Sequence, residues 1–117
     1  MTWRWLCLLA LLVSGPALAQ PEQAEREIDY LLGFVADSGC SFHRNGRDHA
    51  SQEAAEHLRM KYRRAKRYAP TAGSFIDRLA SESSWSGKPY TVTCGEHTEP
   101  SGTWLHQALA DYRAAAD

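Results

Sequence analysis

The stretch 40–46, which reads Cys-Ser-Phe-His-Arg-Asn-Gly, constrains the fold of this chain more than any other. Asn45-Gly46 favours a two-residue type I′ turn, because both central residues of that turn need a positive φ. We therefore predict a short β-hairpin over residues 40–50. Cys40 opens this hairpin, and it is one of the two cysteines that we expect in the mature chain.

The first 19 residues have the pattern of a secretory signal peptide. Arg4 supplies a positive charge, an apolar run follows over residues 6–13, and Ala17-Leu18-Ala19 is an Ala-x-Ala cleavage site. The apolar run is much too short to span a bilayer, and an N-terminal membrane anchor is the alternative. We expect a periplasmic mature chain that begins at Gln20, forms one small domain over residues 20–117 and has no transmembrane segment.

The mature chain is small, because removal of 19 of the 117 residues leaves 98. A domain of this size is marginal on core burial alone, so a covalent link is plausible. Cys7 leaves with the signal, and export then makes a disulfide between Cys40 and Cys94 the default interpretation. A reactive thiol is the alternative, and it would need a lowered pKa.

The charge of the mature chain does not call for a nucleic-acid partner. The whole chain has 13 basic and 14 acidic residues, and cleavage removes one basic residue, Arg4, which leaves 12 against 14. A nucleic-acid-binding domain is expected to be clearly basic. We therefore exclude nucleic acid from the expected partners.

Four segments predict helices, because apolar residues recur in them at spacings of three and four. Ser51, Thr71 and Ser101 stand at the starts of the last three segments, and we interpret them as N-caps. The segments cover residues 22–38, 51–67, 72–81 and 101–113, with a frayed tail over 114–117.

Residues 90–94 predict a half-buried strand, because Tyr90, Val92 and Cys94 alternate with threonines. A bond between Cys40 and Cys94 would place this strand beside the hairpin. We predict loops over residues 82–88 and 95–100. The expected fold class is α+β, with about four helices, a small antiparallel sheet and one disulfide, and an all-α bundle with irregular loops is the alternative.

Short blocks of residues follow one another in a distinctive order along the mature chain. They are Cys40-x-Phe42-x-Arg44-Asn45-Gly46, Ala54 with His57-Leu58 and Lys61-Tyr62, Thr71-Ala72 with Phe75-Ile76, Ser83-Ser84-x-Ser86-Gly87 with Pro89-Tyr90, and Trp104-Leu105 with Tyr112-Arg113. This order resembles the small exported proteobacterial proteins grouped as domain of unknown function 5329. The resemblance covers nearly all of the mature chain, and it implies a periplasmic or secreted single domain. It implies no activity, so no catalytic residue is carried over.

No pattern in the sequence predicts a catalytic or metal site, and we expect no cofactor. The histidines lack the tight ligand pairs of zinc sites, so we interpret them as surface residues. The serines near residue 84 lack a Gly-x-Ser-x-Gly elbow, and paired glutamates are too common on surfaces to indicate glycan cleavage. The residues concerned are His43, His49, His57, His97 and His106, Ser81, Ser83, Ser84 and Ser86, and Glu82, Glu96 and Glu99.

A run of basic residues on the second predicted helix is one candidate binding surface. An anionic envelope component, such as lipopolysaccharide or an anionic lipid, or an acidic protein fits it. A solvated helix end that complements the helix dipole is the alternative. The run contains Arg59, Lys61, Arg63, Arg64, Lys66 and Arg67, and we take Arg59, Arg63 and Arg67 as the candidate binding residues.

The predicted hairpin turn and the serine-rich loop form a second candidate binding surface, because a Cys40–Cys94 bond would bring their flanking strands together. Trp85 is the unusual residue in this loop. We interpret it as plugging the core, and an exposed recognition group is the alternative. The candidate residues are Arg44, Asn45, Ser84, Trp85, Ser86 and Tyr90.

These patterns favour a non-enzymatic binding or accessory protein of the cell envelope. A small envelope hydrolase or cell-wall enzyme is the alternative. An enzyme should show a concave pocket with convergent polar groups and a perturbed titratable residue. A binding module should instead show an exposed aromatic or basic patch, and an envelope protein or an anionic envelope component is its expected partner.

We predict that protein recovered from the periplasm begins at Gln20 and carries its two cysteines as one linked pair. Intact-mass measurement and non-reducing peptide mapping check the two expectations together. A mature chain that retains Cys7 would contradict cleavage at the Ala-x-Ala site. Two titratable thiols in the same material would contradict the disulfide.

Overall fold

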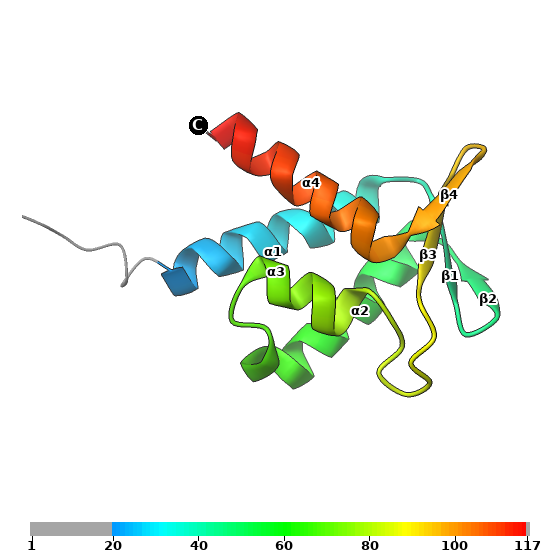
Figure 1. Ribbon diagram of the computed structural model, residues 1–117, viewed down its shortest axis with the longest axis horizontal. Coiled ribbons are helices and arrows are strands. Elements are labelled where there is room, and N and C mark those ends of the chain that lie inside the picture. The colour runs from blue at the N-terminus through cyan, green and yellow to red at the C-terminus, as the bar shows by residue number, and fades with distance from the viewer. Residues whose placement is uncertain (1–19, 117) are drawn as a thin grey trace, which may run out of the picture.

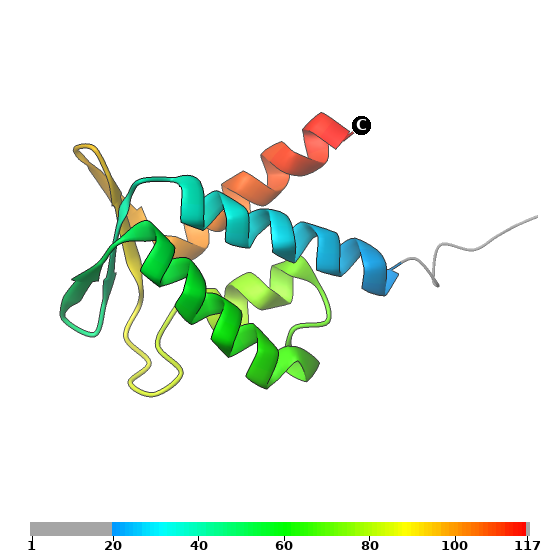
Figure 2. The same ribbon diagram turned by 180° about the vertical axis from the view of Figure 1, so that it is seen from behind.

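The computed structural model describes residues 20–116, and the predicted signal peptide over residues 1–19 lies outside them. The helices pack together as one body and a small sheet stands at its end (Figures 1 and 2). The fold class is therefore α+β, as predicted, and the all-α alternative is wrong. The elements are α1 (Gln20–Asp37), β1 (Ser41–Arg44), β2 (Arg47–His49), α2 (Ser51–Ala65), the 3₁₀ turn η3 (Lys66–Tyr68), α3 (Ala72–Phe75), the π-helical turn η4 (Ile76–Ala80), β3 (Thr91–Cys94), β4 (His97–Pro100) and α4 (Ser101–Ala116).

The sheet is antiparallel, with strand order β2-β1-β3-β4. The predicted hairpin is confirmed: Asn45 and Gly46 have φ angles of 50° and 82°, as a type I′ turn requires. The predicted strand lies beside the hairpin, where Phe42 of β1 is paired with Val92 of β3. Both side chains are buried, so the inner face of the sheet closes the core.

Cys40 and Cys94 lie at the end of the β1–β3 pair. Their Sγ atoms are 2.06 Å apart, which is the distance of a disulfide bond, across 54 positions of sequence. Closing a loop of this length stabilises a fold by about 4 kcal/mol in the chain-entropy account. The predicted pairing of these two cysteines is therefore compatible with the fold.

One predicted loop is wrong, because residues 97–100 form the strand β4, which pairs with β3. The hydroxyls of Thr93 and Thr98 lie 2.7 Å apart across this pair. β4 reads His-Thr-Glu-Pro and buries none of its side chains fully, so it lacks the apolar alternation that identifies a strand. Its place at the edge of the sheet explains this polarity.

The core lies between α1, α2, the α3–η4 segment and α4. The predicted apolar stripe of α1 is confirmed, because Ile28, Leu31 and Val35 are almost completely buried. Phe75 and Leu105 bring the later helices onto the same cluster. Burial of a side chain of this size contributes about 1.5–3 kcal/mol. Within residues 20–116 no helix combines the length and the apolarity needed to cross a bilayer.

Thr71 caps its helix as predicted, through a reciprocal capping box with Ser74. The N-cap prediction for Ser51 is wrong, because Ala50 occupies the cap position. The Ser51 hydroxyl donates instead to the carbonyl of Ala36, which is one of the last carbonyls of α1. Ser101, the third predicted cap, is the first residue of α4.

Two predicted helices are divided in the structure. The helix expected over 51–67 ends at Ala65, where the chain tightens into η3 and the Ala69 N–H donates to the Lys66 carbonyl. The helix expected over 72–81 widens into η4, and the Ser81 hydroxyl donates to the Ile76 carbonyl. Local side-chain and turn contacts decide these ends, and periodicity alone does not report them.

The start of α4 packs closely on the end of η4. A Cβ atom added at Gly102 would lie 2.5 Å from the Ser81 hydroxyl oxygen and 3.4 Å from its Cβ atom. The backbone N–H of Ser101 donates to the Tyr90 carbonyl, and the Tyr90 N–H donates to the Ser81 carbonyl. These contacts fix Tyr90 at the point where the loop 82–89 enters the sheet.

Candidate functional site

A concave cleft of about 360 Å³ lies between α2, the end of η4, the β1–β2 turn and the loop 82–89. We call it the Lys61 cleft. It combines cations, an imidazole, a phenol, an apolar floor and part of the serine-rich loop. Its lining residues are Arg44, Asn45, His57, Met60, Lys61, Arg64, Ala65, Leu79, Ser83, Ser84, Trp85 and Tyr90.

One face of α2, adjacent to its buried stripe, contributes side chains to the cleft. His57, Lys61 and Arg64 are spaced by four and three, so they project from one side of the helix. Ala55 and Leu58, which are buried in the core, lie on the neighbouring side. One helix therefore builds both the core and a wall of the cleft.

The other wall is the loop 82–89, which is fixed to the β1–β2 turn by hydrogen bonds. The buried Ser83 hydroxyl oxygen accepts from the Asn45 side chain and from the backbone N–H groups of Trp85 and Ser86, each at 3.2 Å. The Ser86 hydroxyl donates to Asn45 Oδ1 at 2.6 Å. Asn45 thus bridges two segments that are about forty positions apart.

Trp85 stands at the rim of the Lys61 cleft with 91% of its side chain exposed. The interpretation of Trp85 as a core plug is therefore wrong, and the recognition alternative agrees with this exposure. The physical reason is that the buried Ser83 anchors the loop from inside, and Trp85, two residues later, is turned outward. An exposed aromatic on an ordered loop costs little entropy when it binds a partner.

The cleft also contains a group of polar side chains around Tyr90. The Tyr90 hydroxyl accepts a hydrogen bond from Lys61 Nζ at 3.1 Å and lies 3.4 Å from His57 Nε2. Lys61 Nζ also donates to the Glu82 carbonyl at 3.2 Å. Lys61 therefore links α2 to both ends of the loop.

Burial changes the titration of these groups. It lowers the pKa of Lys61 to about 8, with the nearby Arg44 charge acting in the same direction and Glu82 opposing it. Burial also lowers the pKa of His57 to about 4, helped by the charges of Arg44 and Lys61 and by His49. It raises the pKa of the Tyr90 phenol. All three shifts favour the neutral form of the group.

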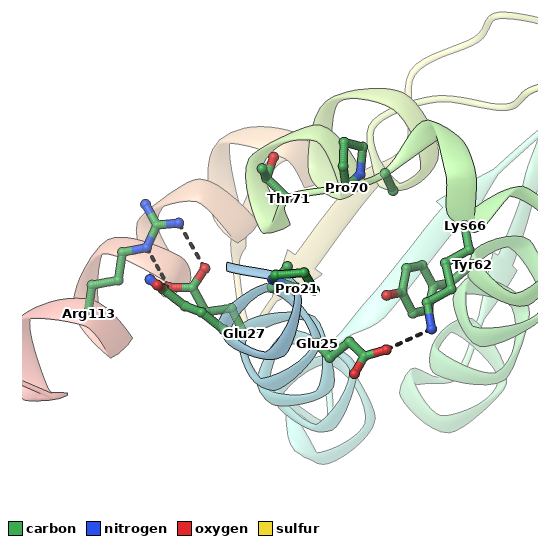
Figure 3. Close-up of a pocket in the computed structure, with 11 residues that line it drawn as sticks. Pro21, Glu25, Glu27, Tyr62, Lys66, Pro70, Thr71 and Arg113 are labelled. Carbon is green, nitrogen blue, oxygen red and sulfur yellow. Dashed lines mark hydrogen bonds and ion pairs between the residues drawn. The ribbon is translucent and has the colours of Figure 1, made fainter. Parts of the chain in front are cut away.

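A second hollow, of about 570 Å³, lies at the start of α1, near Pro21, Pro70 and Thr71 (Figure 3). Its charged side chains are already paired. Lys66 Nζ lies 2.7 Å from Glu25, and Arg113 forms a bidentate pair with the buried Glu27 at 2.7 and 2.9 Å. The charges in this hollow are therefore satisfied within the fold, unlike those of the Lys61 cleft.

The structure brings together most of the candidate residues of the turn and the loop. Ser86 contacts Asn45 beside the cleft. The other candidate surface stays outside, because Arg59 and Arg63 are exposed on another side of α2 and Arg67 lies over the ring of Tyr68. The candidate residues that line the cleft are Arg44, Asn45, Ser84, Trp85 and Tyr90.

Lys61 and Arg64 belong to the predicted basic run, but the sequence did not place them, or His57, in one site with the turn and the loop. Their spacing on one helix face was the available signal. The structure also separates His57 from the other histidines, each of which lies within 3.2 Å of a carboxylate. No group of three or more metal-ligating side chains occurs among residues 20–116.

Comparison with known proteins shows the family to which the chain belongs. A family model described as "Family of unknown function (DUF5329)" matches residues 22–113. The chain belongs to this family. It is also 40% identical, over 85 residues, to the uncharacterized protein YfeK of Salmonella typhimurium strain LT2, a match that covers 71% of each chain. No solved structure matches the chain.

Several blocks that carry the family resemblance meet at the Lys61 cleft. Arg44-Asn45, His57, Lys61, Ser83-Ser84 and Tyr90 belong to these blocks and line it. Neither the family description nor the name of the Salmonella relative states an activity, so the chemistry of the cleft is judged from its own residues.

We predict that His57 makes the fold less stable in acid. In the folded state its pKa is about 4, whereas an unfolded chain should titrate near the usual 6.5. Between these values the unfolded state binds more protons, so the stability present above pH 6.5 falls as the pH drops towards 4. The expected loss is about 1 kcal/mol after allowance for partial solvent exposure of the ring.

Urea unfolding of the wild type and of His57→Gln at pH 7 and pH 4.5 measures this effect. The wild type should lose more stability than the variant over this interval, because the carboxylates titrate in both proteins. NMR titration of the His57 imidazole measures its pKa directly, as the midpoint of the titration curve. Equal losses in the two proteins, or a midpoint near 6.5, would contradict the prediction.

Proposed function

We propose that this chain is an exported accessory protein of the cell envelope that binds an anionic group in the Lys61 cleft without catalysing a reaction. The observation that supports this proposal is an excess of positive charge. Arg44, Lys61 and Arg64 line the cleft, and its lining contains no carboxylate. The ion pairs formed among residues 20–116 include none of these three cations.

The lowered pKa values in the cleft support the same proposal. Lys61 and His57 lose part of their tendency to hold a proton, because they are partly buried beside Arg44 without a strong opposite charge. A bound anion would supply that charge and would favour the protonated forms. Hydrogen bonds from cations to an anionic oxygen are about twice as strong as neutral ones.

The shape of the cleft restricts the bound group. Its volume of about 360 Å³ lies within the range of small-molecule pockets, roughly 300–1,000 Å³. Met60, Ala65 and Leu79 provide an apolar floor below the cations. A ligand that carries a phosphate or carboxylate on an apolar body fits this combination better than a free inorganic ion does.

The proposal of export rests on two observations. The first 19 residues read as a signal peptide with an Ala-x-Ala site. Cys40 and Cys94 lie at disulfide distance, and structural disulfides persist in oxidising compartments such as the periplasm. An envelope location would give the cleft access to anionic lipids, polysaccharides and proteins.

An envelope enzyme is the second candidate, and the lowered pKa of Lys61 favours it. A lysine pKa of about 8 lies in the range expected for a general base, and the Tyr90 hydroxyl lies within hydrogen-bond distance of Lys61. We prefer binding, because the ammonium of Lys61 is already engaged by the Tyr90 hydroxyl and the Glu82 carbonyl. The buried serine of the cleft is Ser83, and its hydroxyl oxygen already accepts hydrogen bonds from three donors.

We predict that glycerol phosphate binds in the cleft and that Arg44→Gln or Lys61→Met weakens this binding at least about tenfold. Each substitution removes a charged donor, and one hydrogen bond to a charged group contributes about 1.5–3 kcal/mol. NMR titration that follows the Trp85 indole and the loop amides measures the affinity. Binding should also weaken with added salt.

Arg59→Gln is the matched control, because it removes one charge from an exposed position of α2 outside the cleft. Its affinity should equal that of the wild type. Equal weakening in Arg59→Gln and Arg44→Gln would mean that only the overall charge attracts the anion. Absence of any shift at the cleft residues would contradict the proposed site.

A further inference from the structure

Two large apolar side chains are exposed in the described part of the chain, Trp85 at 91% and Tyr68 at 51%. Trp85 belongs to the loop 82–89, and Tyr68 belongs to η3 at the end of α2. Both segments lie along the lower edge of the molecule in Figure 1 and in the reverse view of Figure 2. The segments that carry the two exposed aromatics therefore lie along one edge of the fold in these views.

The same segments carry cations. The last turn of α2 contains Arg64, and the guanidinium of Arg67 lies 4.9 Å from the centre of the Tyr68 ring. The loop adds Lys88, which is exposed. Glu82 is the exposed carboxylate of this loop, and it lies on the side of Lys61. We call this surface, made of Arg64, Arg67, Tyr68, Trp85 and Lys88, the docking edge.

We propose that the docking edge binds the surface of an anionic phospholipid membrane, with Trp85 and Tyr68 in the headgroup region and a lipid phosphate in the Lys61 cleft. This inference rests on the proposed function, because the cleft must accept an anionic group. The inference also names the molecule that carries this anionic group, which is a membrane phospholipid. The chain binds the membrane from one side, as a peripheral protein.

The chemistry of the docking edge matches that of a bilayer interface. Tryptophan and tyrosine concentrate at the headgroup level, because each has an apolar ring and a polar end. Arginine and lysine beside them are attracted to the negative surface potential of anionic lipids. The apolar floor of the Lys61 cleft lies beside its cations, so a lipid headgroup can place its phosphate on the cations and its glyceryl carbons on the floor.

The loop is ordered in a way that favours this contact. The Ser83 hydroxyl accepts from the backbone N–H groups of Trp85 and Ser86, and the Asn45 side chain bonds the side chains of Ser83 and Ser86. The ring of Trp85 can therefore enter the interface without first ordering the loop, which lowers the entropic cost of binding.

Binding to vesicles tests the proposal. Wild-type protein should bind vesicles of phosphatidylglycerol and phosphatidylethanolamine and should ignore phosphatidylcholine vesicles. Trp85→Ala should weaken binding at least about tenfold, and Arg64→Gln should weaken it about fivefold, the effect of one interfacial charge. Arg26→Gln is the charge-matched control, because Arg26 is exposed on α1, and it should bind like the wild type.

Fluorescence identifies the side chain that enters the interface. Trp104 packs against Phe34 and Phe42, with ring centroids 4.7 and 5.5 Å away, so its emission should not change. A blue shift on vesicle binding that disappears in Trp85→Ala would support insertion of Trp85. A blue shift that persists in this variant would overturn the proposal.

A parallel titration with glycerol phosphate separates this inference from the proposed function. Binding of glycerol phosphate without binding of anionic vesicles would overturn membrane docking and leave the anion site intact. Failure of both would overturn both. Vesicle binding that is equal in the wild type, Trp85→Ala and Arg64→Gln would overturn the docking edge as the contact surface.

Discussion

The pairing of β1 with β3 is the interaction on which the rest of this structure depends. It joins the two halves of the chain within one sheet, and the Cys40–Cys94 contact closes it across 54 positions. A long loop closure costs conformational entropy, so an early covalent link removes a large part of that cost from folding. Phe42 and Val92 then meet on the inner face and give the helices a common surface to pack on.

The Lys61 cleft is a consequence of the same pairing. When β1 lies beside β3, the β1–β2 turn comes next to the loop that leads into β3, and Asn45 can reach Ser83 and Ser86. The cleft lies between this joined rim and α2. Lys61 and Arg44 are held partly out of water, which lowers the pKa of Lys61 and raises the attraction for an anion. The same bonds that complete the fold therefore prepare the site.

The sequence predicts those parts of the fold that local chemistry decides. Asn45-Gly46 determines its own turn, Thr71 with Ser74 determines a helix start, and the stripe of α1 reports which face is buried. β4 could not be predicted in this way, because an edge strand with polar residues on both faces has no apolar alternation. Its existence depends on β3, which offers it unpaired backbone groups.

The candidate site was predictable only in part, for a related physical reason. The turn and the loop could be placed together from the expected disulfide, and five of the candidate residues do line one cleft. The exposure of Trp85 depends on the Ser83 anchor, and the roles of His57 and Lys61 depend on contact with Tyr90 about thirty positions away. Likewise, the basic run on α2 reads as one surface, but Lys66 is paired with Glu25 of α1 and Lys61 faces the cleft. Long-range contacts divide this run, and its spacing alone does not report the division.

The hydrogen bonds of Asn45 and Ser83 hold Trp85 as a rigid, exposed side of the Lys61 cleft. This rigidity can be measured as the backbone order parameter of the Trp85 amide, from ¹⁵N relaxation of the wild type and of Asn45→Ala. We expect a wild-type value near 0.85, which is typical of rigid backbone, and a clear decrease in the variant. A wild-type value below about 0.6 would instead mean a flexible loop that these hydrogen bonds do not hold.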